Sequence, residues 1–161
     1  MGGDPYCYFT RYQNDIQAAL DALREQEFKA GRYYPAMDTM RGSGFPRDQT
    51  RPGPGSQHAS IAEAIDASEA EGTNSILDIE RITDSPDFAS ACPLPSDELI
   101  AVFGTAEPTR ERLEAVLSSR ELGDDGRSRF WEQIDRGHGR YVVVYDDGEP
   151  REIFFAGYSW D

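Results

Sequence analysis

The chain contains little cysteine, histidine or lysine: two cysteines, two histidines and a single lysine among 161 residues. Two cysteines cannot supply the disulfide framework of a small secreted domain. We expect Cys7 and Cys92 to be buried thiols, with one bridge between them as the open alternative. The histidines and cysteines lie far apart and lack the paired spacing of zinc sites, so no metal site and no cofactor are expected.

Long hydrophobic runs are also missing. No apolar segment approaches the roughly 20 residues that a membrane-spanning helix requires. The first residues lack the basic and apolar regions of a signal peptide. The 38% share of hydrophobic residues still suffices for one core. We therefore expect one soluble domain over residues 1–161, located in the cytoplasm.

Several functional motifs are absent as well. The sequence has no glycine-rich phosphate-binding loop and no G-x-S-x-G motif of serine hydrolases. A formal net charge of −14 opposes binding to nucleic acid and to anionic membranes, whose phosphates carry the same sign. These absences argue against nucleotide, nucleic-acid and membrane binding.

Most of the negative charge lies in the middle segment, residues 52–106, which nets −9. In this segment Arg81 is the only base among ten carboxylates: Glu63, Asp66, Glu69, Glu71, Asp78, Glu80, Asp84, Asp87, Asp97 and Glu98. If these groups share one face of the folded chain, that face attracts cationic partners. Solubility or adaptation to a salt-rich cytoplasm explains the same charge without any partner.

Hydrophobic periodicity predicts an α+β fold in one domain. The C-terminal strands flank an Asp-Gly pair, which is typical of a β-hairpin, and both strands are apolar on successive residues. We predict an antiparallel sheet that includes this hairpin and is packed by helices. The predicted strands span about 6–10, 75–82, 140–145 and 152–156, and the predicted helices about 15–29, 60–70, 97–103, 109–122 and 128–136.

A long loop at about 32–57 interrupts this pattern. It is rich in glycine and proline and carries four arginines, Arg32, Arg41, Arg47 and Arg51. It also contains Tyr33, Tyr34 and Phe45. A loop of this length in a compact domain is usually functional or disordered.

The two histidines are the only candidates for acid–base catalysis near neutral pH. His138 lies between two glycines just before a predicted strand, and His58 follows the long loop. In an enzyme, His138 would be the central base at the end of the sheet, with His58, Asp146 or Asp147 assisting. A solvated turn histidine and a helix-flanking polar residue are the favoured interpretations, and Asp146 and Asp147 are explained by the hairpin turn.

The preferred hypothesis is an acidic protein-binding module, of the immunity or regulatory kind, that engages a basic protein partner. Its predicted contact residues are three aromatic residues of the long loop and three acids of the middle segment: Tyr33, Tyr34, Phe45, Glu63, Asp66 and Glu69. A small enzyme with a site at His138 is the alternative. The sequence does not determine the oligomeric state.

Overall fold

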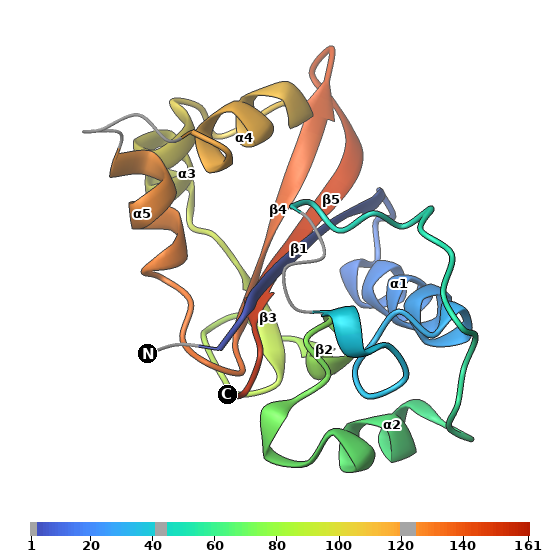
Figure 1. Cartoon of the computed structure of the whole chain (residues 1–161). Helices are drawn as coiled ribbons and strands as arrows, with labels where there is room; N and C mark the ends of the chain where they lie inside the picture. Colours follow the sequence, from blue (N-terminus) through green and yellow to red (C-terminus); the bar gives the residue numbers. More distant parts are fainter. Residues whose placement is uncertain (1–2, 41–44, 120–124) are drawn as a thin grey trace.

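The computed structural model describes residues 3–40, 45–119 and 125–161. Its centre is a five-stranded sheet with helices on both faces (Figure 1). The strands are β1 (Pro5–Arg11), β2 (Arg81–Ile82), β3 (Ser90–Pro93), β4 (Gly139–Asp146) and β5 (Glu149–Tyr158), in the order β1-β5-β4-β3-β2. The helices are α1 (Ile16–Ala30), α2 (Ile61–Ser68), α3 (Ser96–Phe103), α4 (Arg110–Leu117) and α5 (Asp125–Trp131). Three short 3-10 turns span Asp38–Met40, Glu69–Glu71 and Ile76–Asp78.

The prediction of an antiparallel sheet is wrong, because the sheet is mixed. Strand β5 is antiparallel to both β1 and β4, whereas β3 is parallel to β4 and to β2. Between β3 and β4 the chain passes through α3, α4 and α5, and such a helical crossover brings the next strand back in the same direction. The sequence pattern shows the strands but not this return path.

The C-terminal hairpin is confirmed. Strands β4 and β5 pair along their length, and the turn residues Asp147 and Gly148 both have positive φ, at 50° and 74°. Two positive φ values are the mark of a type I′ turn, which Asp-Gly favours. The helices on both faces account for the continuous apolar character of these strands.

Alternating residues of the strands build two separate cores. Cys7, Phe9 and Phe154 face α3, α4 and α5, where they join Phe130 and Leu113. The intervening residues face α1 and the turn at Ile76–Asp78, in a second core of Tyr6, Tyr8, Ala19, Leu20, Leu23, Ile76, Ile79, Ala91, Ile153 and Phe155. The period of two along each strand therefore decides which helical layer each side chain meets.

Helix boundaries agree with the capping residues in most places. Asp15 caps α1 by accepting a hydrogen bond from the Ala18 N–H. Ser60 and Glu63 form a capping-box pair that opens α2: the Ser60 hydroxyl accepts from the Glu63 N–H, and the Glu63 carboxylate accepts from the Ala59 N–H. Ser96 precedes the helix predicted at 97–103, where a serine is an expected N-cap, but in the structure Ser96 is the first residue of α3. The N-cap of α3 is Pro95, and no side chain caps this helix.

Other segments differ from the predicted boundaries. Only Arg81–Ile82 of the predicted strand at 75–82 is a strand, because Ile76–Asp78 forms a 3-10 turn. Strand β3 was not predicted, since its four residues show little periodicity. Helices α4 and α5 are shorter than predicted, and residues 120–122 of the helix predicted at 109–122 lie outside the described residues.

The described part of the long loop covers the outer edge of β1. The Arg47 N–H donates to the Cys7 carbonyl at 2.9 Å, and Gln49 Nε2 donates to the Phe9 carbonyl at 2.6 Å. These bonds occupy acceptors that an exposed edge strand would otherwise offer to another chain. Arg41 lies outside the described residues.

Gly31 provides the first stability prediction. Its φ is 74°, and a Cβ placed there would lie 2.2 Å from the Gly55 carbonyl oxygen. Gly148 has the same φ of 74° but nothing within 4 Å of a new Cβ, so Gly148→Ala reports the cost of the positive φ alone, about 1–2 kcal/mol. Gly31→Ala should cost clearly more, because backbone must also move. Urea unfolding of both variants measures the difference, and equal losses would contradict the close approach.

Candidate functional site

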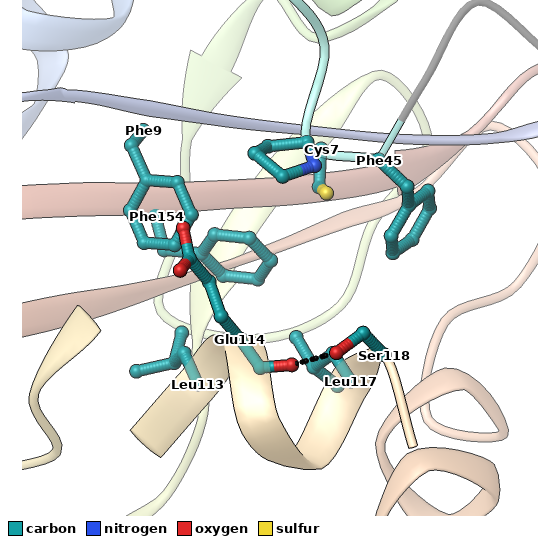
Figure 2. Close-up of a pocket in the computed structure, with 9 residues that line it drawn as sticks. Cys7, Phe9, Phe45, Leu113, Glu114, Leu117, Ser118 and Phe154 are labelled. Atoms are coloured by element: carbon teal, nitrogen blue, oxygen red, sulfur yellow. Dashed lines mark hydrogen bonds between the residues drawn. The ribbon is translucent and has the colours of Figure 1, made fainter. Parts of the chain in front are cut away.

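A concave site, a cavity of about 290 Å³, lies between the sheet and α4. Cys7 and Phe9 from β1 and Phe154 from β5 line one side. Leu113 and Leu117 of α4 line the other, as Figure 2 shows. Phe45 and Pro46 from the long loop close the third side, and Glu114 and Ser118 lie at the α4 rim.

Local sequence spacing explains why this cavity is apolar. Cys7 and Phe9 are two residues apart on a strand and therefore point to the same face. Leu113 and Leu117 are four residues apart on α4 and therefore form one stripe. Burial raises the pKa of the Cys7 thiol well above its ordinary value. The thiol is therefore neutral and acts as a small apolar group, not as a nucleophile.

The rim of the cavity carries charge. Arg110 Nε donates to Glu114 at 2.9 Å, and its Nη1 donates to Glu152 at 2.9 Å. The Arg110 guanidinium also lies 4.1 Å from the centre of the Phe9 ring. Two carboxylates thus share one guanidinium, which leaves a net charge of −1 in this ion-pair cluster.

Two further hollows of about 470 Å³ each lie nearby: the first shares the lining residue Phe45 with the cavity, and the second shares lining residues with the first. The first contains Phe45, Trp131 and Tyr158, and the second shares Trp131 and Tyr158. The ring centres of Phe45 and Trp131 are 5.3 Å apart, as are those of Trp131 and Tyr158. We call the two hollows and these three rings the aromatic groove. The charged residues that line it are Arg127, Glu132, Asp135 and Arg136.

The structure does not bring the predicted catalytic residues together. His138 precedes β4, and its Nδ1 lies 2.9 Å from the Arg136 carbonyl. Asp146 and Asp147 are exposed at the opposite end of this eight-residue strand. An extended strand of that length places them roughly 25 Å from His138. These residues therefore do not form one catalytic site.

His58 belongs to a different cluster. Its Nδ1 lies 2.7 Å from the hydroxyl of Tyr33, which is fully buried and stacked on Phe28. The Gln57 N–H also donates to this hydroxyl, at 3.3 Å. His58 thus ties the end of the long loop to the core beside α1.

The predicted partner-binding residues are spread over the molecule. Phe45 is 40% exposed and lies in the aromatic groove, whereas Tyr33 is buried. Tyr34 is partly exposed, and its N–H donates to the Thr73 carbonyl at 2.9 Å. The three predicted acids, Glu63, Asp66 and Glu69, are exposed in or just after α2, away from the groove.

The ten acids of the middle segment do not form one face. Helix α2 packs beside α1, whereas α3, which carries Asp97 and Glu98, lies on the other side of the sheet (Figure 1). Asp78 is fully buried. Arginines pair with two others: Glu98 with Arg129 at 2.8 Å and Asp87 with Arg81 at 2.7 Å. The charge of the segment is therefore divided and partly neutralised.

Sequence reasoning missed most of the aromatic groove. Trp131 lies in the helix predicted at 128–136, and Tyr158 lies beyond the last predicted strand at 152–156. Phe45 was the one usable signal, because an aromatic residue inside a glycine- and proline-rich loop has few apolar neighbours in sequence. Its partners come from α5 and β5 and are found only in the folded chain.

Within the described residues, no three histidine, cysteine, aspartate or glutamate side chains come together as a metal site. None of the helices in the same residues combines the length and apolar character that crossing a membrane requires. Both cysteines are free and buried, as the sequence predicted. Comparison with protein families, with curated proteins and with solved structures found no match to this chain.

Proposed function

We propose that this chain is a protein-binding module that engages a segment of a basic partner in the aromatic groove. The observation that carries the proposal is a row of three neighbouring hollows that share Phe45, Trp131 and Tyr158 as lining residues. Tyrosine and tryptophan are enriched in the residues that dominate binding energy at protein interfaces. The exposed ring of Phe45 supplies apolar area for such a contact.

The dimensions suit an extended peptide segment. The hollows run beside the chain from Gly3 to Phe9. Six residue steps of extended chain cover roughly 20 Å. A partner segment of about six residues therefore matches the length of the cavity and groove together.

The net charge of the protein indicates the sign of the partner's charge. A charge of −14 attracts cationic proteins from a distance and raises their rate of association. The groove is lined by two acids, Glu132 and Asp135, and by two arginines, Arg127 and Arg136, so local pairing sets the register of the bound segment. The long-range attraction should weaken as salt shortens the range of electrostatic interaction.

A random six-residue peptide display library, panned on the whole protein, tests this proposal. We expect the enriched peptides to combine apolar residues with lysine or arginine. Phe45→Ser should weaken their binding at least tenfold, because it removes the exposed ring of the groove. The matched control is Phe88→Ser, which removes a ring that is 49% exposed outside the groove and should change binding less than twofold.

Two outcomes would contradict the proposal: no enrichment at any salt concentration, or enriched peptides that bind Phe45→Ser as well as the unmodified protein. Enrichment of acidic peptides would contradict the proposed positive charge of the partner.

The enzyme alternative receives no comparable support, because His138 is far from Asp146 and Asp147 along β4. We propose the cytoplasm as the location. Free thiols such as Cys7 and Cys92 persist in a reducing compartment.

A further inference from the structure

We infer that the cavity between β1, β5 and α4 receives one apolar side chain of the partner, with a lysine or arginine beside it at the rim. The inference rests on the proposed function and specifies the chemistry of the partner. It is carried by two independent features of the described residues: the apolar walls of the cavity and the unequal charges at its rim.

The walls define the size and polarity of the occupant. Phe9, Leu113, Leu117 and Phe154 present only carbon atoms, and the neutral Cys7 thiol adds a small polarizable group. A volume of about 290 Å³ is at the lower end of the range for small-molecule pockets. It therefore suits a single aromatic or aliphatic side chain better than a whole cofactor.

The rim determines the charge next to that side chain. Arg110 is already held by Glu114, Glu152 and the face of the Phe9 ring. It is therefore not free to receive an anion. The side chains of Glu114 and Glu152 remain 45% and 27% exposed. Their excess negative charge favours a cation at the rim and repels a carboxylate.

The connection to the groove places the rest of the partner. Phe45 is a wall of both the cavity and the first hollow of the groove. A side chain anchored in the cavity thus lets the following residues pass over Phe45 toward Trp131. One continuous segment fills both parts.

Two small probes of matched size test this inference on the whole protein: phenethylammonium and 3-phenylpropanoate. Each has an apolar ring and one charge, of opposite sign. Ligands this small bind through few atoms, so we expect a dissociation constant on the order of millimolar for phenethylammonium. Binding of 3-phenylpropanoate should be at least fivefold weaker. NMR chemical-shift titration measures both constants and shows whether the shifted signals include Cys7 and Leu117.

Three variants separate the cavity from its rim. Ser118→Trp places a large ring at the exposed rim and should abolish binding of both probes, with the melting temperature changed by only a few degrees. Glu114→Gln keeps the shape and should reduce the preference for phenethylammonium to less than twofold. The control Glu111→Gln removes an exposed carboxylate of the same helix that does not line the cavity, and it should leave the preference unchanged.

The inference is overturned if neither probe binds, if 3-phenylpropanoate binds more tightly, or if Glu111→Gln and Glu114→Gln act equally. The probe pair and Glu114→Gln decide the matter even if Ser118→Trp fails to fold. If the probes fail while library peptides still depend on Phe45, this inference falls and the proposed function stands. If the probes bind but no peptide is enriched, the proposed function falls, and the cavity is a site for small organic cations only.

Discussion

Replacing Arg32 with alanine is expected to lower the free energy of unfolding by about 3–5 kcal/mol, the usual cost of leaving a buried charge without its partner. Glu27, near the end of α1, is 1% exposed, and Arg32 is 9% exposed. The Arg32 guanidinium donates to Glu27 through Nε at 3.1 Å and through Nη2 at 2.5 Å. The hydrogen bond to Glu27 raises the pKa of Arg32 above its ordinary value.

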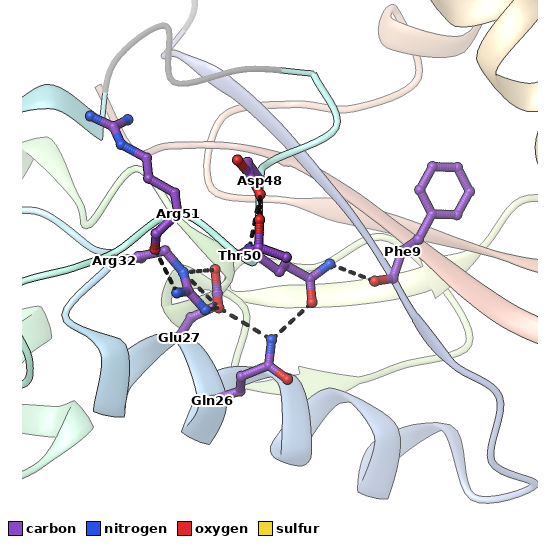
Figure 3. A network of polar contacts seen from close by, with 8 residues as sticks. Phe9, Gln26, Glu27, Arg32, Asp48, Thr50 and Arg51 are labelled. Carbon is purple, nitrogen blue, oxygen red and sulfur yellow. Dashed lines mark hydrogen bonds and ion pairs between the residues drawn. The ribbon is translucent and has the colours of Figure 1, made fainter.

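The same pair holds the long loop against the helix, as Figure 3 shows. Arg32 Nη1 donates to the Arg51 carbonyl at 2.9 Å. Gln26 Nε2 donates to Gln49 at 2.9 Å, and Gln49 in turn donates to the Phe9 carbonyl. Loss of Arg32 should therefore also loosen the loop that covers the edge of β1.

An exposed ion pair of the same helix is the control. Lys29 Nζ lies 3.4 Å from Glu25, and their side chains are 72% and 51% exposed. Lys29→Ala should cost at most about 0.5 kcal/mol, because exposed pairs contribute little. The double replacement Glu27→Leu with Arg32→Met should regain much of the stability lost in Arg32→Ala, since apolar residues can replace a buried ion pair. Urea unfolding at pH 7 measures all three, and similar losses in Arg32→Ala and Lys29→Ala would refute the buried pair.

Replacing Asp78 with asparagine is expected to raise the free energy of unfolding, relative to the unmodified protein, more at neutral pH than at acid pH. Asp78 is fully buried, and burial raises the pKa of its carboxyl from 3.8 to about 6. Its Oδ1 accepts hydrogen bonds from the Thr73 N–H at 2.8 Å and hydroxyl at 2.7 Å, and asparagine can keep both. Its Oδ2 has no hydrogen-bond partner in the described residues.

The direction of this pH dependence follows from proton linkage. Between pH 3.8 and 6 the folded state binds more protons at Asp78 than the unfolded state, so this residue lowers stability as pH rises. The cost is absent below about pH 4 and complete above about pH 6, where a shift of this size corresponds to about 2–3 kcal/mol. The asparagine side chain of the variant carries no charge at either pH and therefore lacks this dependence.

Urea unfolding of Asp78→Asn and of the unmodified protein at pH 4 and pH 7 checks this prediction. The variant should gain about 2–3 kcal/mol over the unmodified protein between these pH values. Asp87→Asn is the control, because a hydrogen bond from Arg81 lowers the pKa of the exposed Asp87 carboxyl below its ordinary value of 3.8. The effect of that carboxylate on stability therefore changes mainly below pH 4, and the difference between Asp87→Asn and the unmodified protein should be nearly the same at pH 4 and pH 7. A pH-independent difference for Asp78→Asn would rule out a costly buried charge.

Local features of the fold were predictable from the sequence. The stripe and caps of α1, the capping box of α2 and the Asp-Gly hairpin all depend on residues within a few positions of one another. Interactions of this range can be predicted from the local sequence pattern. The covered faces of β4 and β5 were also predictable, because their apolar residues do not alternate with polar ones.

Long-range relations were not predictable in the same way. The direction of β3 beside β4 depends on a crossover of three helices. No local sequence pattern predicts this direction. Ten acids counted along 52–106 also gave no information about their positions in space. Folding placed α2 and α3 on different sides of the sheet and buried Asp78.

The sequence by itself determined the sign of the net charge, the helices with strong caps, the hairpin and the two-sided burial of its strands. Only the tertiary structure decided where the charges lie and which aromatic side chains meet. Phe45, Trp131 and Tyr158 come from a loop, a helix and a strand that are distant in the chain. Contacts of this kind depend on how the layers pack, and packing couples residues without regard to their separation in sequence.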